Sequence, residues 1–294
     1  WSDDYHHAIH VALTRETTGY YGDFEPLGAL AKVMERGFFH DGTFSTFRDR
    51  DHGHPIDVER MPSWRLVVSA QNHDQIGNRA VGDRIVEALD DSQLLVAAML
   101  LYAGPYTPML FQGEEWAASS PFQFFTSHPE AELGRLTAEG RIAEFAAMGW
   151  DPDVVPDPQD PATFERSRLR WEELGSGRHA TVLEGYRRLA TLRREWAALT
   201  DPSLHANAVV VDEEARTLRL TRGGSLRVAG SSDAEAAPGT GPVDVLVNVG
   251  GAAWEAPVPL GATLLFATST DVALDDAAVH LPPGSGALVA LPSR

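Results

Sequence analysis

Apolar side chains in the first part of the chain recur at the spacing of a helix. They occupy residues 8–13, and Asp3 or Asp4 precedes them as a candidate N-terminal cap. A second short helix is expected to open at Pro26 and to carry the apolar residues of the 27–33 stretch. The chain therefore begins with two predicted amphipathic helices, followed by a loop-like stretch up to residue 62.

Two uninterrupted apolar runs predict buried strands, Leu66–Ala70 and Tyr106–Gln112. Between them we expect a helix over Ala80–Leu89 and another over Gln93–Gly104, which is apolar almost all round and therefore buried. Strands with continuous apolar runs that alternate with helices are typical of a parallel sheet covered on both faces.

The rest of the chain changes character near residue 201. Before this point, helices are predicted near Glu130–Met148 and His179–Leu199, with a proline-rich loop between them. After it, short apolar runs separated by turns predict a small antiparallel β domain; the runs lie in residues 208–230, 243–250, 263–268 and 287–291. We therefore expect an α/β part at residues 1–200 and a β domain at residues 201–294.

Composition narrows the classes of partner. The 294 residues are 43% hydrophobic, which is enough for a substantial core, and the formal net charge is -18. This charge argues against a nucleic-acid partner and favours a neutral or weakly charged substrate. The chain has no cysteine, no run of membrane-spanning length and no charged-then-apolar leader, so we expect a cytoplasmic protein with no membrane partner.

A polar cluster, QNHDQIGNRA at residues 71–80, directly follows the first predicted strand. On one interpretation Asp74 or Asn78 caps the helix expected at Ala80. On the other the cluster is functional, because catalytic groups of parallel α/β folds lie at the carboxyl ends of strands. An Asp carboxylate accepts hydrogen bonds from two neighbouring sugar hydroxyls, and His73 beside it adds a donor.

The NHD sequence after an apolar strand resembles the fourth conserved region of the α-amylase superfamily of glycoside hydrolases. The longer form, QNHDQIGNRAVGDR, resembles the malto-oligosyltrehalose trehalohydrolase family within it. Further segments that share this resemblance are WSDDYHHAIHVALT, GYYGDF, FSTFRDRDHG, PMLFQGEEW, PFQFFTSHPE and DPQDPATFERSRLRW. The resemblance covers the chain from end to end, and together these motifs are specific to the family.

The resemblance implies the C-terminal part of a (β/α)8 barrel followed by an antiparallel β-sandwich. It also implies a retaining hydrolase that cleaves the α-1,4 bond next to the trehalose end of maltooligosyltrehalose. Asp74 then matches the carboxylate that stabilises the transition state, and His73 matches the sugar-binding histidine. Trp1 corresponds to a point after the sixth barrel strand, so the nucleophile and the general acid are expected upstream. We expect this chain to be inactive alone, to need the missing N-terminal barrel half as a partner, and to use no cofactor.

Further substrate contacts are expected from six residues, several of which have a structural role as the alternative. Gln75 and Arg79 belong to the polar cluster, and Arg79 is equally plausible as a salt-bridge partner; the same holds for Arg48, which follows the aromatic Phe47. The remaining two are acidic. Asp4 is a candidate sugar contact or a helix cap, and Glu114 in the GEE motif is a structural or subsite residue that, with its neighbour, would point to opposite faces of a strand.

Three alternatives remain at this stage. His6, His7 and His10 suggest a metal site, because His6 and His10 share one helical face at the spacing that zinc hydrolases use; no general-base Glu lies between them and no third ligand is evident, so we expect no metal. A non-catalytic module that binds α-1,4-glucan through exposed aromatic side chains would also fit the chain. The third alternative is another α-amylase-superfamily enzyme, such as an amylase or a branching enzyme.

Overall fold

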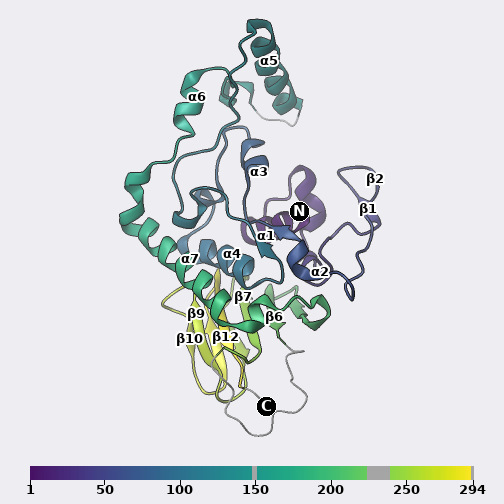
Figure 1. Ribbon diagram of the computed structural model, residues 1–294, viewed down its shortest axis with the longest axis vertical. Helices are drawn as coiled ribbons and strands as arrows, with labels where there is room; N and C mark the ends of the chain where they lie inside the picture. Colours follow the sequence, from purple (N-terminus) through teal and green to yellow (C-terminus); the bar gives the residue numbers. More distant parts are fainter. Residues whose placement is uncertain (148–150, 224–238, 293–294) are drawn as a thin grey trace. The chain divides into compact units, whose positions relative to one another are not determined.

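The computed structural model of the chain describes residues 1–147, 151–223 and 239–292. The chain divides into two compact units, which are described separately (Figure 1). Unit 1 comprises Trp1–Ala70, Leu89–Met109 and Glu184–Arg294, and unit 2 comprises Gln71–Ala88 and Leu110–Leu183.

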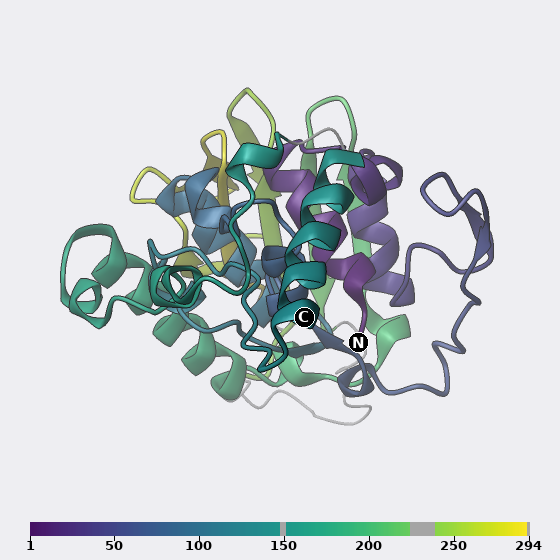
Figure 2. The same cartoon turned by 90° about the horizontal axis from the view of Figure 1, so that it is seen from above.

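Three helices of unit 1 confirm the helical patterns in the sequence. Helix α1 spans Asp3–Thr14, α2 spans Leu27–Arg36 and α4 spans Asp91–Ala103. The cap of α1 is Ser2, so Asp3 and Asp4 lie inside the first turn. Helices α1 and α2 lie side by side (Figure 2).

The cap of α4 is a reciprocal pair of side-chain bonds between Asp90 and Gln93. Asp90 accepts a hydrogen bond from the Gln93 N–H at 2.8 Å, and the Gln93 side chain accepts one from the Asp90 N–H at 3.1 Å. This capping box satisfies amides that the first helical turn leaves without partners. It starts α4 at a defined residue, which matters because α4 is buried on nearly every side.

The predicted parallel pairing is present, although the regular strands are shorter than the apolar runs. Strand β3 spans Val67–Val68 and β4 spans Thr107–Pro108, in parallel register. Two backbone bonds extend the pairing, from Thr107 N–H to the Leu66 carbonyl (2.9 Å) and from Met109 N–H to the Val68 carbonyl (2.8 Å). The described residues contain these two parallel strands and not a closed barrel.

Two antiparallel sheets form the C-terminal part of unit 1. The five-stranded sheet has the order β5-β6-β7-β12-β9, and the three-stranded sheet has the order β10-β11-β8. The strands are β5 (Ala208–Asp212), β6 (Thr217–Arg222), β7 (Val243–Asn248), β8 (Trp254–Pro257), β9 (Thr263–Ala267), β10 (Ala273–Leu274), β11 (Ala278–Leu281) and β12 (Ser285–Ala290). The part of the predicted 208–230 run after Gly223 lies outside the described residues. The antiparallel β prediction is confirmed.

Side chains of both sheets share one core, which makes this part a sandwich. Leu246 of β7, Ala256 of β8, Val279 of β11 and Val289 of β12 all belong to it. The opposite face of β7 and β12 is covered by α4 (Figure 1). Every residue of these two strands is consequently buried, which explains their nearly continuous apolar sequence.

Carboxylates fasten α2 to the edge strand β5. Glu213, in the turn after β5, accepts hydrogen bonds from the N–H groups of Leu27 (2.9 Å) and Gly28 (2.6 Å) at the start of α2. In the other direction, Glu35 accepts a bond from the Val209 N–H at 3.2 Å. These contacts satisfy helix-terminal amides and occupy part of an otherwise open strand edge.

Unit 2 consists of short helices joined by long loops. It contains α3 (His73–Gly77), α5 (Ala131–Ala147), α6 (Pro161–Arg166) and the 3-10 helices η3 (Ile85–Glu87), η4 (Glu114–Trp116), η5 (Pro152–Val154) and η6 (Trp171–Gly175). Helix α5 agrees with the predicted helix near Glu130, whose last residue, Met148, lies outside the described residues. Helix α7 (Gly177–Glu195) crosses from unit 2 into unit 1 and is followed by α8 (Ala197–Thr200).

The helix expected over Ala80–Leu89 is wrong, because only Ile85–Glu87 is helical there. Gly82 adopts a φ of +67°, and a Cβ at this position would lie 2.5 Å from the Phe122 backbone. The Phe122 N–H also donates to the Gly82 carbonyl at 2.8 Å. A close approach of a second chain segment therefore overrides the local helical pattern.

Within the described part of the chain, no helix is both long enough and apolar enough to cross a membrane.

The contact between α4 and β12 gives a stability prediction. A Cβ on Gly286 would lie 2.5 Å from Met99 Cε and 2.9 Å from the Leu246 carbonyl oxygen. We expect Gly286→Ala to lower the free energy of unfolding by about 1–3 kcal/mol through overpacking. Gly251→Ala is the matched control, since a Cβ there meets nothing within 4 Å, and should change it by less than about 0.5 kcal/mol. Urea unfolding curves measure both, and equal midpoints would contradict the prediction.

Candidate active-site segment

The polar cluster begins with a helix cap at Asn72. This residue is extended and buried, and its side-chain oxygen Oδ1 accepts hydrogen bonds from the N–H groups of Asp74 (2.8 Å) and Gln75 (3.3 Å). Two amides of the first turn are satisfied in this way, so the chain enters helix α3 immediately. The interpretation that Asp74 or Asn78 caps a helix at Ala80 is wrong, because residues 80–84 are not helical; the cap in this segment is Asn72, at the start of α3.

The cap leaves Asp74 in the first turn of α3 with its side chain exposed to solvent. Its Oδ1 accepts a hydrogen bond from Asn78 Nδ2 at 2.8 Å, one helical turn later. Among the described residues, no hydrogen bond reaches Oδ2. The carboxylate is therefore held at one oxygen and open at the other, beside an exposed His73.

Gln75 has the opposite environment. Its side chain is 7% exposed, and its Oε1 is buried without a hydrogen-bond partner among the described residues. A buried amide oxygen without a partner costs about 1–3 kcal/mol. This cost makes Gln75 a candidate for a contact that forms only when another group is present.

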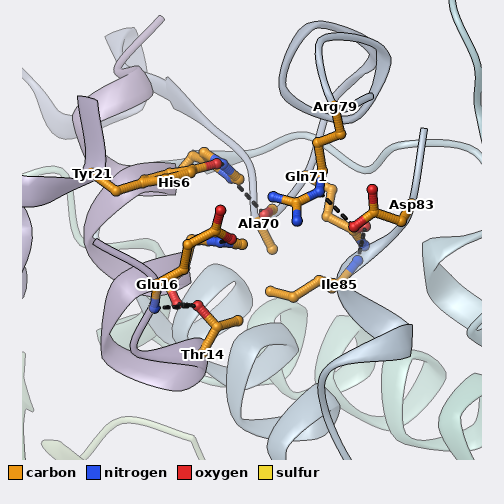
Figure 3. A network of polar contacts seen from close by, with 10 residues as sticks. His6, Thr14, Glu16, Tyr21, Ala70, Gln71, Arg79, Asp83 and Ile85 are labelled. Carbon is orange, nitrogen blue, oxygen red and sulfur yellow. Dashed lines mark hydrogen bonds and ion pairs between the residues drawn. The ribbon is translucent and has the colours of Figure 1, made fainter. Parts of the chain in front are cut away.

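Arg79 is paired with an acid of its own segment. Its Nε lies 2.6 Å from Asp83 Oδ2, and both side chains are largely shielded from solvent (Figure 3). In the same segment, Gln71 Oε1 accepts a bond from the Ile85 N–H at 3.1 Å, so the loop from residue 71 to residue 85 closes on itself (Figure 3). The salt-bridge alternative for Arg79 is thus realised, and sugar binding by this residue stays a prediction.

Glu114 lies in the 3-10 helix η4, so the expectation of an extended strand at the GEE motif is wrong. The side chain is 5% exposed, and Oε2 accepts a hydrogen bond from the Phe111 N–H at 3.1 Å. The carboxylate stabilises its own loop, which favours the structural interpretation of this residue.

Three predicted site residues lie in unit 1. The Asp4 carboxylate accepts hydrogen bonds from the N–H groups of Phe39 (2.8 Å) and His40 (3.0 Å), so it ties α1 to the loop that follows α2. Phe47 is 58% exposed and lies between strands β1 (Thr43–Ser45) and β2 (Arg50–His52), with the exposed Arg48 next to it. An exposed aromatic ring beside a guanidinium is a surface on which a sugar ring can stack.

The histidines of α1 have protein partners. His6 Nδ1 donates to the Ala70 carbonyl at 2.7 Å, and its Nε2 lies 3.3 Å from the Tyr21 hydroxyl (Figure 3). His10 Nε2 lies 2.8 Å from a Glu16 carboxylate oxygen. Among the described residues, no group of three or more His, Asp or Glu side chains is arranged to hold a metal ion.

His7 is packed among aromatic rings. The rings of Tyr20 and Phe24 lie 4.8 and 5.1 Å from it, centroid to centroid. Burial, and then the neighbouring charges of His10, His40 and Arg48, lowers the pKa of His7 from 6.5 to about 3. The side chain is therefore neutral at physiological pH.

Two residues were missed in the sequence. Asn72 belongs to the predicted polar cluster, but it is not predicted to be the cap of α3. An Asn two residues before an Asp in the first helical turn is a recognisable cap signal. The other is Arg84, which is 3% exposed and bonded to the loop after β4. No sequence signal identifies it, because its acceptors are backbone carbonyls distant along the chain.

The sequence of this chain is similar to those of one family of enzymes. A malto-oligosyltrehalose trehalohydrolase from Rhizobium sp. (strain M-11) is 52% identical over 292 residues, which are 98% of this chain and 45% of the relative. One from Arthrobacter ramosus is 57% identical over 228 residues, or 78% of this chain and 39% of the relative. The chain thus spans less than half the length of the curated relatives it matches. No protein-family model matches the sequence.

A solved structure supports the fold. The crystal structure of a candidate α-amylase from Salmonella typhimurium matches 99% of this chain and 46% of its own, with a TM-score of 0.80 and 30% identity. The resemblance to malto-oligosyltrehalose trehalohydrolases over part of their length is therefore confirmed, as is an α/β glycoside-hydrolase-like fold with antiparallel sheets.

The Asn72 cap leads to a prediction about local stability. Asn72→Ala removes the acceptor for two amides and should destabilise the folded chain by about 1 kcal/mol. Asn72→Asp keeps an acceptor at the same position and should restore most of this loss. Hydrogen exchange of the Asp74 and Gln75 amides is the measurement, and unchanged exchange in Asn72→Ala would show that the cap does not stabilise α3.

The His7 pKa gives a pH prediction. Between pH 6.5 and about 3 the unfolded chain binds a proton at His7 that the folded chain does not, so stability falls as pH falls. The slope contributed by this residue is at most about 1.4 kcal/mol per pH unit. His7→Gln should flatten the dependence of unfolding free energy on pH in this window. His54→Gln, at an exposed position, is the control; equal slopes in wild type and His7→Gln would contradict the assignment.

Proposed function

The chain is a homologue of the malto-oligosyltrehalose trehalohydrolases, and on this premise we propose that it forms part of a retaining glycoside hydrolase. The proposed reaction is cleavage of the α-1,4 bond next to the trehalose end of maltooligosyltrehalose, with release of trehalose. In this proposal β3, α4, β4 and α7 belong to the last part of a (β/α)8 barrel at residues 1–200, and residues 201–294 form the sandwich domain.

The observation that carries the proposal is the state of Asp74. Its carboxylate is exposed at the first turn of α3, bonded to Asn78 through Oδ1 and unbonded at Oδ2 within the described residues. An anion held in this way can accept hydrogen bonds from adjacent sugar hydroxyls. Its charge then favours the oxocarbenium-like transition state over the neutral ground state.

The neighbours of Asp74 supply the proposed substrate contacts. His73 adds an exposed imidazole donor, and the unpartnered Oε1 of Gln75 adds an acceptor. Arg79 is a weaker candidate, because its Nε is already bonded to Asp83. Asp4 and Glu114 are weaker candidates, since backbone amides already bind their carboxylates; Phe47 and Arg48 offer a separate stacking surface.

The bond-breaking groups are proposed to lie in the part of the family's length that this chain does not span. A retaining mechanism needs two carboxyl groups about 5–5.5 Å apart. The neighbouring acids Glu114 and Glu115 do not fit, because Glu114 is bonded within its own loop. We propose that the chain alone does not hydrolyse the substrate and that it requires the rest of the barrel.

A second candidate function is binding of α-1,4-glucan without hydrolysis. It is favoured by exposed rings, namely Phe47 (58% exposed), Phe124 (40%) and Phe125 (37%). Calorimetry of the isolated chain with maltooligosaccharides separates the two. Tight binding that Phe47→Ala abolishes and Asp74→Asn leaves unchanged would favour the binding module.

The enzyme proposal predicts a turnover defect in Asp74→Asn. The chain is joined to the portion of the Rhizobium sp. M-11 relative that it does not cover, and trehalose release from maltooligosyltrehalose is assayed. Asp74→Asn should lower kcat by at least about 100-fold while KM changes only a few-fold, because the contact strengthens in the transition state. Asp271→Asn, at an exposed position of the sandwich, should keep full activity. Full turnover in Asp74→Asn would remove Asp74 from the mechanism.

A further inference from the structure

Arg84 is a buried cation that bonds to main-chain carbonyls. Its side chain is 3% exposed, Nε donates to the Ser120 carbonyl at 2.7 Å and Nη1 donates to the Gln112 carbonyl at 2.9 Å. The guanidinium also lies over the Phe111 ring, 5.2 Å from its centroid. One side chain therefore bonds to both ends of the segment from Gln112 to Ser120, which contains η4.

Arg84 itself belongs to a second segment, residues 71–88. Ile85, the next residue, donates its N–H to Gln71 Oε1, which closes the 71–85 loop around α3. Further bonds join this loop to later parts of unit 2: Phe122 N–H to the Gly82 carbonyl (2.8 Å), Gln123 Nε2 to the Val81 carbonyl (3.2 Å), and Arg141 Nη2 of α5 to the Gly77 carbonyl. Among Arg84, Gln123 and Arg141, Arg84 has the lowest exposed fraction.

Burial of this guanidinium is costly. Desolvation lowers the pKa of Arg84, and the nearby carboxylates of Glu114, Glu115 and Glu173 only oppose that shift. In addition, Nη2 has no hydrogen-bond partner among the described residues. Buried charges are weak sources of stability, and apolar replacements of similar volume are often tolerated. The site thus calls for a reason other than stability.

We propose that Arg84 is a positioning residue for the α3 turn. It locks the 71–88 segment to the 110–120 segment and thereby keeps the Asp74 carboxylate in one orientation; this role in catalysis rests on the proposed function. The carbonyls of Gln112 and Ser120 are more than one helical turn apart along the chain, and the planar guanidinium of an arginine donates to both at once. A lysine ammonium keeps the charge but presents it as a single point.

The mechanical part of the proposal is tested on the 294-residue chain itself by hydrogen exchange. Arg84→Met and Arg84→Lys should both speed amide exchange in residues 73–78 and 112–120, at least about 10-fold, while β7 and β12 stay protected. Arg168→Met is the matched control, because Arg168 is exposed and, among the residues that the structure describes, pairs with Glu165 of its own segment. Faster exchange confined to residues 112–120 would overturn the coupling to α3.

The catalytic part is tested in the fusion with the uncovered portion of the Rhizobium sp. M-11 relative. Arg84→Lys and Arg84→Met should lower kcat about 10- to 100-fold with KM within about 3-fold, as expected for a displaced catalytic group. Added methylguanidinium should restore a measurable part of kcat in Arg84→Ala and have no effect on Asp74→Asn. A purely structural role predicts a lower active fraction with an unchanged kcat per folded molecule, and that result would overturn the proposal.

The two proposals fail in different ways. A fusion that keeps full turnover with Asp74→Asn contradicts the proposed function, whereas the hydrogen-exchange result for Arg84 does not depend on that assay. A fusion that loses activity with Asp74→Asn but keeps wild-type kcat with Arg84→Met supports the proposed function and overturns the positioning role.

Discussion

The geometry of the candidate site depends on one amide oxygen, Asn72 Oδ1. By accepting two backbone N–H groups it caps the five-residue helix α3, which begins at the next residue, His73. A helix this short has little stability of its own, since the first turn costs more entropy than it returns. The exposed Asp74 therefore owes its position to a cap on one side and to segment-to-segment bonds on the other.

Four of the acidic residues described above differ in what they bind. Asp4, Glu114 and Glu213 each accept hydrogen bonds from main-chain amides, and these bonds hold loops and a helix end in place. Asp74 differs, because within the described part of the chain its carboxylate accepts a side-chain hydrogen bond from Asn78 alone and remains exposed. This contrast separates a candidate for substrate chemistry from neighbours of the same residue type.

Much of the architecture was predictable because it follows from local patterns. Helices α1, α2 and α4, the parallel pairing of β3 with β4 and the antiparallel sheets all follow from apolar spacing. The failures involve contacts distant in sequence. The 80–89 helix is prevented by Phe122 approaching Gly82, and the GEE motif is turned into η4 by a carboxylate that bonds to Phe111. For the site, the polar cluster was found, but the Arg84 contacts depend on carbonyls 28 and 36 residues away.

The position of α4 has a consequence for how this polypeptide can be divided. Its apolar surface covers β7 and β12 of the sandwich. Along the chain, the same helix lies between strands β3 and β4. Excision of the sandwich would remove β7 and β12 from α4 and expose side chains of this helix, such as Met99, to water. Evolutionary exchange of this β-rich tail between homologues would therefore require matched changes along one face of a single helix.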